Sequence, residues 1–375
     1  MRDPEISSLV AEPAESPPLP ISRFAIVPAW LRKTLLAVVA LFFFILALEL
    51  LKKGAGPLGP LLKQTLGIKN ATNTLGFGWL VAYGVLSGSP VAAIALSFFD
   101  QQVITDIQTF SMITGSRLGA SFIVLFVGFL YYLRGHNRGA SIAIGVLCLV
   151  VTATIYLPAM ALGYWMLTSG MFNVIRLDSG SLLTGILDLI YDPIVGQVVY
   201  WLGAWPWLVF LLGIGTLLGS FNLLDRALPE MNAERSAFQQ IGRLVYRPFA
   251  MFVLGMAVTS VTLSVSVSLS ILVPLSAKGF IRRENMLPYI MGANITTFID
   301  TLFAALVMSG PAAFTIVLVE MLSVTIISLI VLLFFYRWYE RALIAMLDLV
   351  MRNNRTLASF VVVMLITPLI LLFWP

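Results

Sequence analysis

Long apolar stretches separated by short polar segments run through most of the chain. A stretch of about 20 apolar residues crosses the hydrocarbon core of a bilayer as a helix. Stretches close to that length occupy residues 35–51, 118–133, 140–167, 195–218, 249–275, 312–335 and 357–373. Two further regions, roughly 75–122 and 260–308, are apolar but interrupted by Gly, Pro, Ser and Thr. The pattern predicts an all-α, polytopic membrane protein.

Composition agrees with this class. Hydrophobic residues fill 59% of the 375 positions and charged residues only 11%, which excludes a soluble globular domain. The net charge of +5 comes from short clusters between the apolar stretches, an arrangement typical of cytoplasmic loops and not of a nucleic-acid surface. The segment 168–196 carries Asp178, Asp188 and Asp192 and is expected to be an external loop. We therefore expect the lipid bilayer, and no nucleic acid, as a partner.

An internal repeat divides the chain. Offsetting the sequence by 177 residues aligns the two interrupted regions without a gap. The expected organisation is a disordered cytoplasmic tail (1–32), a first half (33–225) containing one copy at about 75–135, a cytoplasmic linker (226–246), and a second half (247–375) containing the other copy at about 250–310 and the C-terminal helices.

Each copy has the same order of features: a Ser-bearing segment, a short apolar piece, a polar tip, and a second apolar piece. Ser87 and Ser89 align with Ser264 and Ser266, and Gly115-Ser116-Arg117 aligns with Gly292-Ala293-Asn294. The apolar pieces beside each tip are too short for a full crossing. They predict a re-entrant hairpin and a broken helix in each copy, which is where transporters place their central site.

Serines alternate with apolar residues in the second copy, at Ser264, Ser266, Ser268 and Ser270. In an unwound segment this period would put all four hydroxyls on one side, where they could bind an oxyanion. In an ordinary helix each hydroxyl would bond a carbonyl one turn back. Both interpretations stay open at this stage.

The segment after the second tip is unusually polar for a membrane span. A helix beginning near Asn294 would present free N–H groups to an anion. Thr296 and Asp300 would then share a face, with Thr297 beside them, and their oxygens could hold Na⁺ or a proton. A carboxylate inside a membrane is a functional hypothesis by default, although a structural hydrogen bond would also explain Asp300.

Two other charged residues lie within apolar sequence. Arg117 could neutralise an anionic substrate or extend to the membrane interface. Glu320 could be a cation or proton site or a hydrogen-bonded structural residue. The small residues Gly215 and Gly219 are four positions apart, a spacing typical of close helix packing.

Enzymatic chemistry finds little support. The single histidine, His136, and the single cysteine, Cys148, have no metal-binding or nucleophile–base pattern around them. We expect neither an enzyme nor a bound cofactor.

The second copy resembles the type II sodium-dependent phosphate cotransporter family. The resemblance rests on Ile271-Leu272-Val273-Pro274-Leu275, Leu287-Pro288, Gly292-Ala293-Asn294-Ile295 and Ala304-Ala305-Leu306. It covers roughly 260–306 well and 85–121 faintly. It implies two inverted repeats, re-entrant hairpins that meet at the membrane midplane, and Na⁺-coupled uptake of phosphate. The family's Gln-Ser-Ser-Ser run would fall at 263–266 and 87–90, and neither segment keeps it.

The sequence thus predicts a multi-pass symporter of a prokaryotic plasma membrane that carries inorganic phosphate with Na⁺ as coupling ion. Predicted substrate-binding residues are Ser87, Ser89, Gly115, Ser116, Arg117, Ser264, Ser266, Ser268, Gly292, Ala293 and Asn294. Candidate Na⁺ ligands are Ser264, Ser266, Thr296, Thr297 and Asp300. A relative that carries another anion or uses protons, and a non-transporting membrane scaffold or regulator, remain alternatives.

Overall fold

The structure is a computed structural model that describes residues 29–133, 138–172, 180–227, 247–270, 272, 281–308 and 311–375. Every regular element in this part of the chain is helical. Seven helical stretches within it are long and apolar enough to cross a membrane. The predicted all-α class and the predicted multi-pass membrane character are confirmed.

Seven α-helices come first along the described part of the chain. They are α1 (Ala29–Ala55), α2 (Ala71–Val85), α3 (Ser89–Asp100), α4 (Asp106–Ala120), α5 (Phe122–Leu133), α6 (Arg138–Thr168) and α7 (Gly180–Leu202), with the short elements η1 (Gly56–Leu58) and η2 (Leu61–Thr65) after α1.

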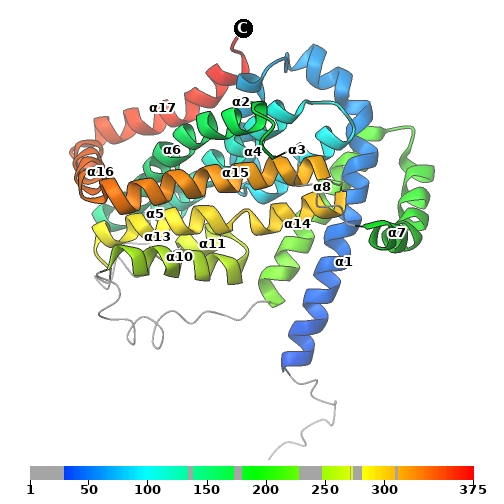
Figure 1. The fold of residues 1–375 in the computed structure, drawn as a ribbon, viewed down its shortest axis with the longest axis horizontal. Helices are drawn as coiled ribbons and strands as arrows, with labels where there is room; N and C mark the ends of the chain where they lie inside the picture. Colours follow the sequence, from blue (N-terminus) through cyan, green and yellow to red (C-terminus); the bar gives the residue numbers. More distant parts are fainter. Residues whose placement is uncertain are drawn as a thin grey trace, which may run out of the picture.

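The chain continues with α8 (Pro206–Ala227), which ends the first half, and then with the helices of the second half: α10 (Pro248–Thr262), α11 (Val265–Ser270), α13 (Arg283–Thr296), α14 (Ile299–Met308), α15 (Pro311–Ile330), the π-helix η4 (Val331–Phe335), α16 (Tyr336–Met351) and α17 (Asn354–Leu372). Figure 1 shows α1 and α8 together at one end of the molecule, with α15 running along the bundle beside α13 and α14.

The two copies have the same backbone plan at the predicted offset of 177 residues. Helices α2 and α10 begin and end at equivalent positions. Helices α5 and α14 begin at equivalent positions as well. The residues that end α2 and α10 are Leu86 and Leu263, which both have positive φ, 55° and 48°. A left-handed leucine is strained, so its occurrence at both equivalent positions marks a defined break in each copy.

Glycines at equivalent positions pack the paired helices. An added Cβ at Gly78 of α2 would collide with the carbonyl of Met112, and one at Gly255 of α10 would collide with that of Tyr289, 177 residues further on. Small residues permit such close helix contacts. Gly115 and Gly292 likewise face the backbone of the neighbouring helix, at Leu75 and Phe252 respectively. These two predicted substrate residues are therefore packing positions.

The equivalence extends to α1 and α8, whose first residues are also 177 apart. These helices pack closely on one another: Gly54 lies against Phe210, and Gly213 lies against Leu51. The contacts run in opposite directions along the two chains, so α1 and α8 are antiparallel. The expected packing role of Gly215 and Gly219 is wrong within the described residues, none of which lies within 4 Å of an added Cβ at either position.

Several predicted boundaries need correction. The span 195–218 is two helices, because α7 ends at Leu202 and α8 begins at Pro206. Pro206 opens α8 at a position where its missing N–H costs nothing. Helix α7 also occupies much of the expected loop 168–196. The spans 118–133 and 249–275 are interrupted at Ser121 and Leu263.

The predicted domain ends differ slightly from the helix ends. Helix α1 begins at Ala29, inside the expected tail 1–32, and α8 continues to Ala227, inside the expected linker 226–246. The remainder of the tail and of the linker lies outside the described residues, as does His136.

Candidate functional site

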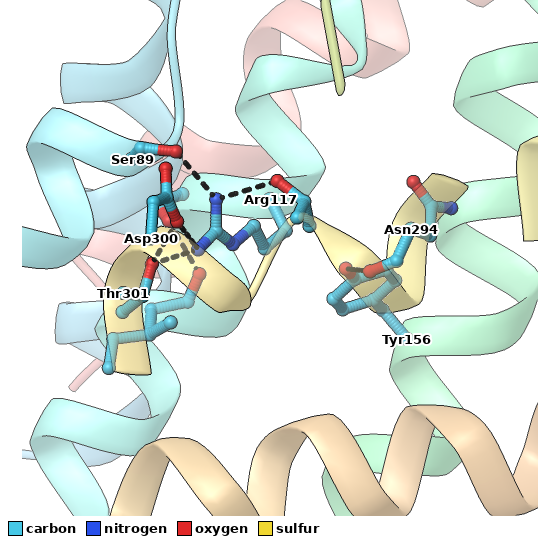
Figure 2. A network of polar contacts seen from close by, with 9 residues as sticks. Ser89, Arg117, Tyr156, Asn294, Asp300 and Thr301 are labelled. Atoms are coloured by element: carbon cyan, nitrogen blue, oxygen red, sulfur yellow. Dashed lines mark hydrogen bonds and ion pairs between the residues drawn. The ribbon is translucent and has the colours of Figure 1, made fainter. Parts of the chain in front are cut away.

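Arg117 lies buried where α3, α4 and α14 meet (Figure 2). Its side chain is 2% exposed, so the interpretation that it extends to the membrane interface is wrong. One terminal nitrogen donates to Ser89 Oγ at 3.3 Å and to Thr297 Oγ1 at 3.2 Å. The other donates to Thr301 Oγ1. A buried guanidinium needs such partners because its donors have lost water.

Backbone breaks in both copies make room for this side chain. Gly88, between α2 and α3, is so close that an added Cβ would lie 3.3 Å from an Arg117 terminal nitrogen. In the second copy α13 ends at Thr296 and α14 begins at Ile299. Phe298, in that break, lies under the guanidinium with its ring centre 4.8 Å from Cζ, a cation–π distance. Arg117 thus joins the two breaks.

Asp300 in the first turn of α14 supplies the opposite charge. Its Oδ1 lies 3.9 Å from an Arg117 terminal nitrogen and accepts from Thr301 Oγ1 at 2.9 Å. A carboxylate is favoured there by the free N–H groups and dipole of the helix start. Asp300 Oδ2 and Arg117 Nε are both buried and have no hydrogen-bond partner in the part of the chain that the structure describes. The pair is loose, and each member retains an unused polar atom.

A cavity of about 330 Å³ reaches Asp300. Its walls come from α1, α8 and α14 and from Leu263, the residue at the break of the second copy. Asp300 is the only charged residue in this lining, which is otherwise apolar except for Ser220. The carboxylate therefore lies beside both the Arg117 guanidinium and an apolar cavity that is open on one side, where Leu41 and Phe303 are exposed.

Asn294 belongs to a second polar group on the other side of Phe298. Its side-chain nitrogen donates to Thr152 Oγ1 at 3.1 Å, and its carbonyl accepts from the Tyr156 hydroxyl at 2.9 Å. The prediction that a helix begins near Asn294 is wrong, because this residue lies in the last turn of α13. Its side chain ties α13 to α6 and does not present helix N–H groups to an anion.

Most of the serine row of the second copy is helical, which contradicts the interpretation of an unwound row. Residues 265–270 form α11, and only Leu263 and Ser264 are unwound. Ser264 Oγ accepts from Val267 N at 3.3 Å near the start of α11. Ser268 is buried and bonds both Thr259 and Tyr289 through its hydroxyl. The backbone of Ser266 is part of α11, but its side chain lies outside what the structure describes.

The other predicted residues divide between the site and the packing. Ser116 and Thr296 bond backbone carbonyls, those of Ile113 and Met256 respectively. The break between α13 and α14 also prevents Thr296 and Asp300 from sharing a helix face. Ala293 is fully buried and Ser87 is half-buried at the first break. The structure brings together Ser89, Arg117, Thr297 and Asp300 from the predicted set.

Thr301 and Phe298 are parts of the Arg117 environment that the sequence analysis missed. The available signal was their place beside Asp300 and Thr297 in a polar run inside an apolar region. Glu320 on α15, considered only as an isolated residue, bonds Thr114 on α4 at 2.9 Å and so connects the two halves.

A bundle of apolar helices with two equivalent broken segments and a buried charged site between them is the arrangement of a membrane transporter. Residues 216–351, from α8 to the end of α16, match the Na⁺/Pi-cotransporter family. This match confirms the resemblance predicted for residues 260–306 and includes Asn294, Asp300 and Glu320, whereas the fainter resemblance at 85–121, with Arg117, lies outside the matched residues. No curated protein and no solved structure matches the chain.

Proposed function

We propose that this protein is a secondary active transporter that couples Na⁺ entry to uptake of inorganic phosphate across a prokaryotic plasma membrane. The observation that carries the proposal is the buried Arg117–Asp300 pair, which lies at the breaks of both copies. It is supported by the match of residues 216–351, which include Asp300, to the Na⁺/Pi-cotransporter family. An anion and a cation need opposite charges in one low-dielectric site, and this pair provides both.

The copies are proposed to be inverted repeats whose short helices are re-entrant. Antiparallel packing of the equivalent helices α1 and α8 supports the inversion. Helix α3 has 12 residues, a length of about 18 Å at the α-helical rise, whereas the hydrocarbon core is about 30 Å thick. It is too short to cross, and its break at Leu86 is a natural place for the chain to turn back.

The geometry favours an order in which Na⁺ binds first. Asp300 Oδ2 is an unused, buried oxygen ligand next to a cavity, and hard cations prefer oxygen. A cation there would offset the charge that holds Arg117. The guanidinium could then turn its terminal nitrogens and its unused Nε to phosphate, which arginine binds with two parallel hydrogen bonds. Coupling would follow because the anion site forms only after the cation enters.

Uptake of ³²P-labelled phosphate into proteoliposomes tests the function. With an inward Na⁺ gradient we expect accumulation, and with choline in place of Na⁺ we expect none. Accumulation that persists in choline and follows a proton gradient would favour the proton-coupled relative. Transport of another oxyanion in place of phosphate would favour the different-substrate relative, and no transport by folded protein of any anion tested would favour a scaffold.

The variant Asp300→Asn tests the binding order. Because a neutral amide no longer competes for Arg117, we expect phosphate affinity in this variant to be independent of Na⁺, whereas the wild type should bind phosphate at least tenfold more tightly with Na⁺ than with choline. Equilibrium binding of ³²P-phosphate to purified protein measures both affinities. Retained Na⁺ dependence in the variant would remove Asp300 from the coupling mechanism.

A further inference from the structure

Glu320 is a second carboxylate buried within the helix bundle, and the proposed transport cycle does not use it. It lies in the middle of α15 and is 1% exposed. Its Oε1 is 2.9 Å from Thr114 Oγ1, whereas no described residue forms a hydrogen bond with its Oε2. Among the described residues it forms no ion pair, although the Arg117 charge acts on it electrostatically.

Charge balance in this part of the bundle is uneven. The buried ionisable cluster consists of Arg117, Asp300 and Glu320, because Arg117 is the charged group that acts on both carboxylates. With both carboxylates ionised, one positive and two negative charges would leave a net charge of −1 in a low-dielectric interior. Such a charge is neutralised in practice by a cation or by a proton.

Distances identify Glu320 as the carboxylate that lacks compensation. Asp300 lies 3.9 Å from the Arg117 guanidinium and has Thr301 as a further donor. Glu320 has only the Thr114 hydroxyl, which is also 3.0 Å from the carbonyl of Phe110. A threonine hydroxyl has one hydrogen for these two acceptors. An ionised Glu320 would therefore depend on a shared donor and leave Oε2 charged and unpaired, which is costly.

A proton on Glu320 removes both difficulties. The carboxylic acid donates from Oε1 to Thr114 Oγ1, and Thr114 donates its own hydrogen to the Phe110 carbonyl. Oε2 becomes a neutral carbonyl oxygen, which costs much less to bury than a charged one. The cluster then has one positive and one negative charge.

We propose that Glu320 is a proton-binding site, occupied in the ligand-free protein by a proton taken from the aqueous phase. Thr114, which accepts from the protonated acid, is its positioning residue. When Glu320 loses its proton, its carboxylate becomes a second negative charge that attracts Arg117. The protonation state of Glu320 would therefore affect the Arg117–Asp300 pair. The effect on transport rests on the proposed function, whereas protonation itself does not.

Other ionisable groups on the helices around α15 do not compensate Glu320. Tyr156 on α6 interacts with it electrostatically, but the Tyr156 hydroxyl donates to the Asn294 carbonyl. Helices α3, α13 and α14 also pack on α15. On α3, Asp100 lies at a half-exposed helix end, and on α14, Asp300 lies beside Arg117. On α13, Arg283 and Glu284 lie in the first turn, and Tyr289 is bonded to Ser268.

Infrared spectroscopy of the purified full-length protein at neutral pH tests the protonation directly. We expect a carbonyl stretch of a buried, protonated carboxylic acid that disappears in Glu320→Gln and persists in the matched control Glu340→Gln, a half-exposed residue of α16. In Thr114→Val the band should remain but shift in frequency, because the acid loses its acceptor. Absence of the band in the wild type, or its survival in Glu320→Gln, would overturn the proposal.

Phosphate uptake at different pH values tests the consequence for transport. The wild-type uptake rate should fall with rising pH, by up to about tenfold per pH unit, as Glu320 loses its proton. A glutamine is permanently neutral, so the uptake rate of Glu320→Gln should stay constant over the same pH range. Glu340→Gln should behave like the wild type. A Glu320→Gln variant that keeps the wild-type pH profile would exclude a role in transport. A protein that carries no phosphate at all would refute the proposed function but leave the infrared result intact.

Discussion

At the scale of single residues, the site depends on the buried Arg117–Asp300 ion pair, in which each partner has a polar atom without a hydrogen bond to a described residue. Replacing a buried pair with neutral groups is often tolerated, but removing one partner leaves the other charge unpaired. Arg117 has more partners than Asp300, because three hydroxyls accept from it. The two residues should therefore differ in how the protein responds to their loss.

Arg117→Gln should destabilise the protein by roughly 3–5 kcal/mol, because the Asp300 carboxylate then has no counter-charge. The double variant Arg117→Gln with Asp300→Asn should recover part of this loss, since neither position then carries a charge. Thermal unfolding in detergent, followed by intrinsic fluorescence, compares the midpoints. Equal midpoints for the single and double variants would mean that the 3.9 Å pair contributes no coupling energy.

At the residue level, the sequence indicated the charged members of the Arg117 cluster more sharply than the small polar groups around them. Arg117 and Asp300 stand out because ionisable residues in apolar sequence are costly, whatever the fold. Ser116, Thr296 and Ser268 could not be separated from ligands in the same way, because a hydroxyl in a helix either bonds a nearby group or remains free. That choice depends on neighbours such as Met256 and Tyr289, which tertiary packing brings into place.

At the scale of helices, the repeat was visible in the sequence but the position of its breaks was not. The 177-residue offset placed Leu86 opposite Leu263, and the structure gives both a left-handed backbone. Nothing in a leucine announces such a conformation, because the preference of the residue is against it. The residue types around the second break do not mark its position either: a helix start was expected at Asn294, whereas the break lies at Thr297 and Phe298.

Glycine substitutions provide a test of the helix pairing. Gly255→Ala should destabilise the protein by roughly 1–3 kcal/mol, because the new methyl group would collide with the Tyr289 carbonyl and force α10 away from α13. The matched control is Gly219→Ala on α8, where the space is open and alanine should be neutral or stabilising by up to about 1 kcal/mol. Thermal unfolding of the two variants measures the difference. A Gly255→Ala protein as stable as the control would contradict this packing.

At the scale of the whole molecule, the site takes one part from each half. Ser89 and Arg117 come from the first copy, and Thr297, Asp300 and Thr301 come from the second. The charged residues of the site do not repeat, since Arg117 is equivalent to Asn294 and Asp300 is equivalent to Ile123. The fold is therefore repeated while its chemistry is not, which explains why sequence self-comparison indicated the architecture more readily than the site.

The cavity between α1, α8 and α14 includes Asp300 in its lining, and under the proposed function it is the expected access route, which labelling can test. In alternating access the site is open to one side of the membrane at a time. A cysteine introduced as Leu263→Cys, in the cavity wall, should react with a membrane-impermeant maleimide from one side only. Na⁺ together with phosphate should change the labelling rate, because binding shifts the population between the two open states.

The native Cys148 should not react with the maleimide, because it is the only cysteine and is fully buried. Wild-type protein should therefore remain unlabelled under the same conditions. Labelling of Leu263→Cys from both sides at equal rates would indicate a continuous pore and contradict alternating access. Labelling from one side at a rate that neither Na⁺ nor phosphate alters would separate the cavity from the transport cycle, and a different route to Asp300 would then be required.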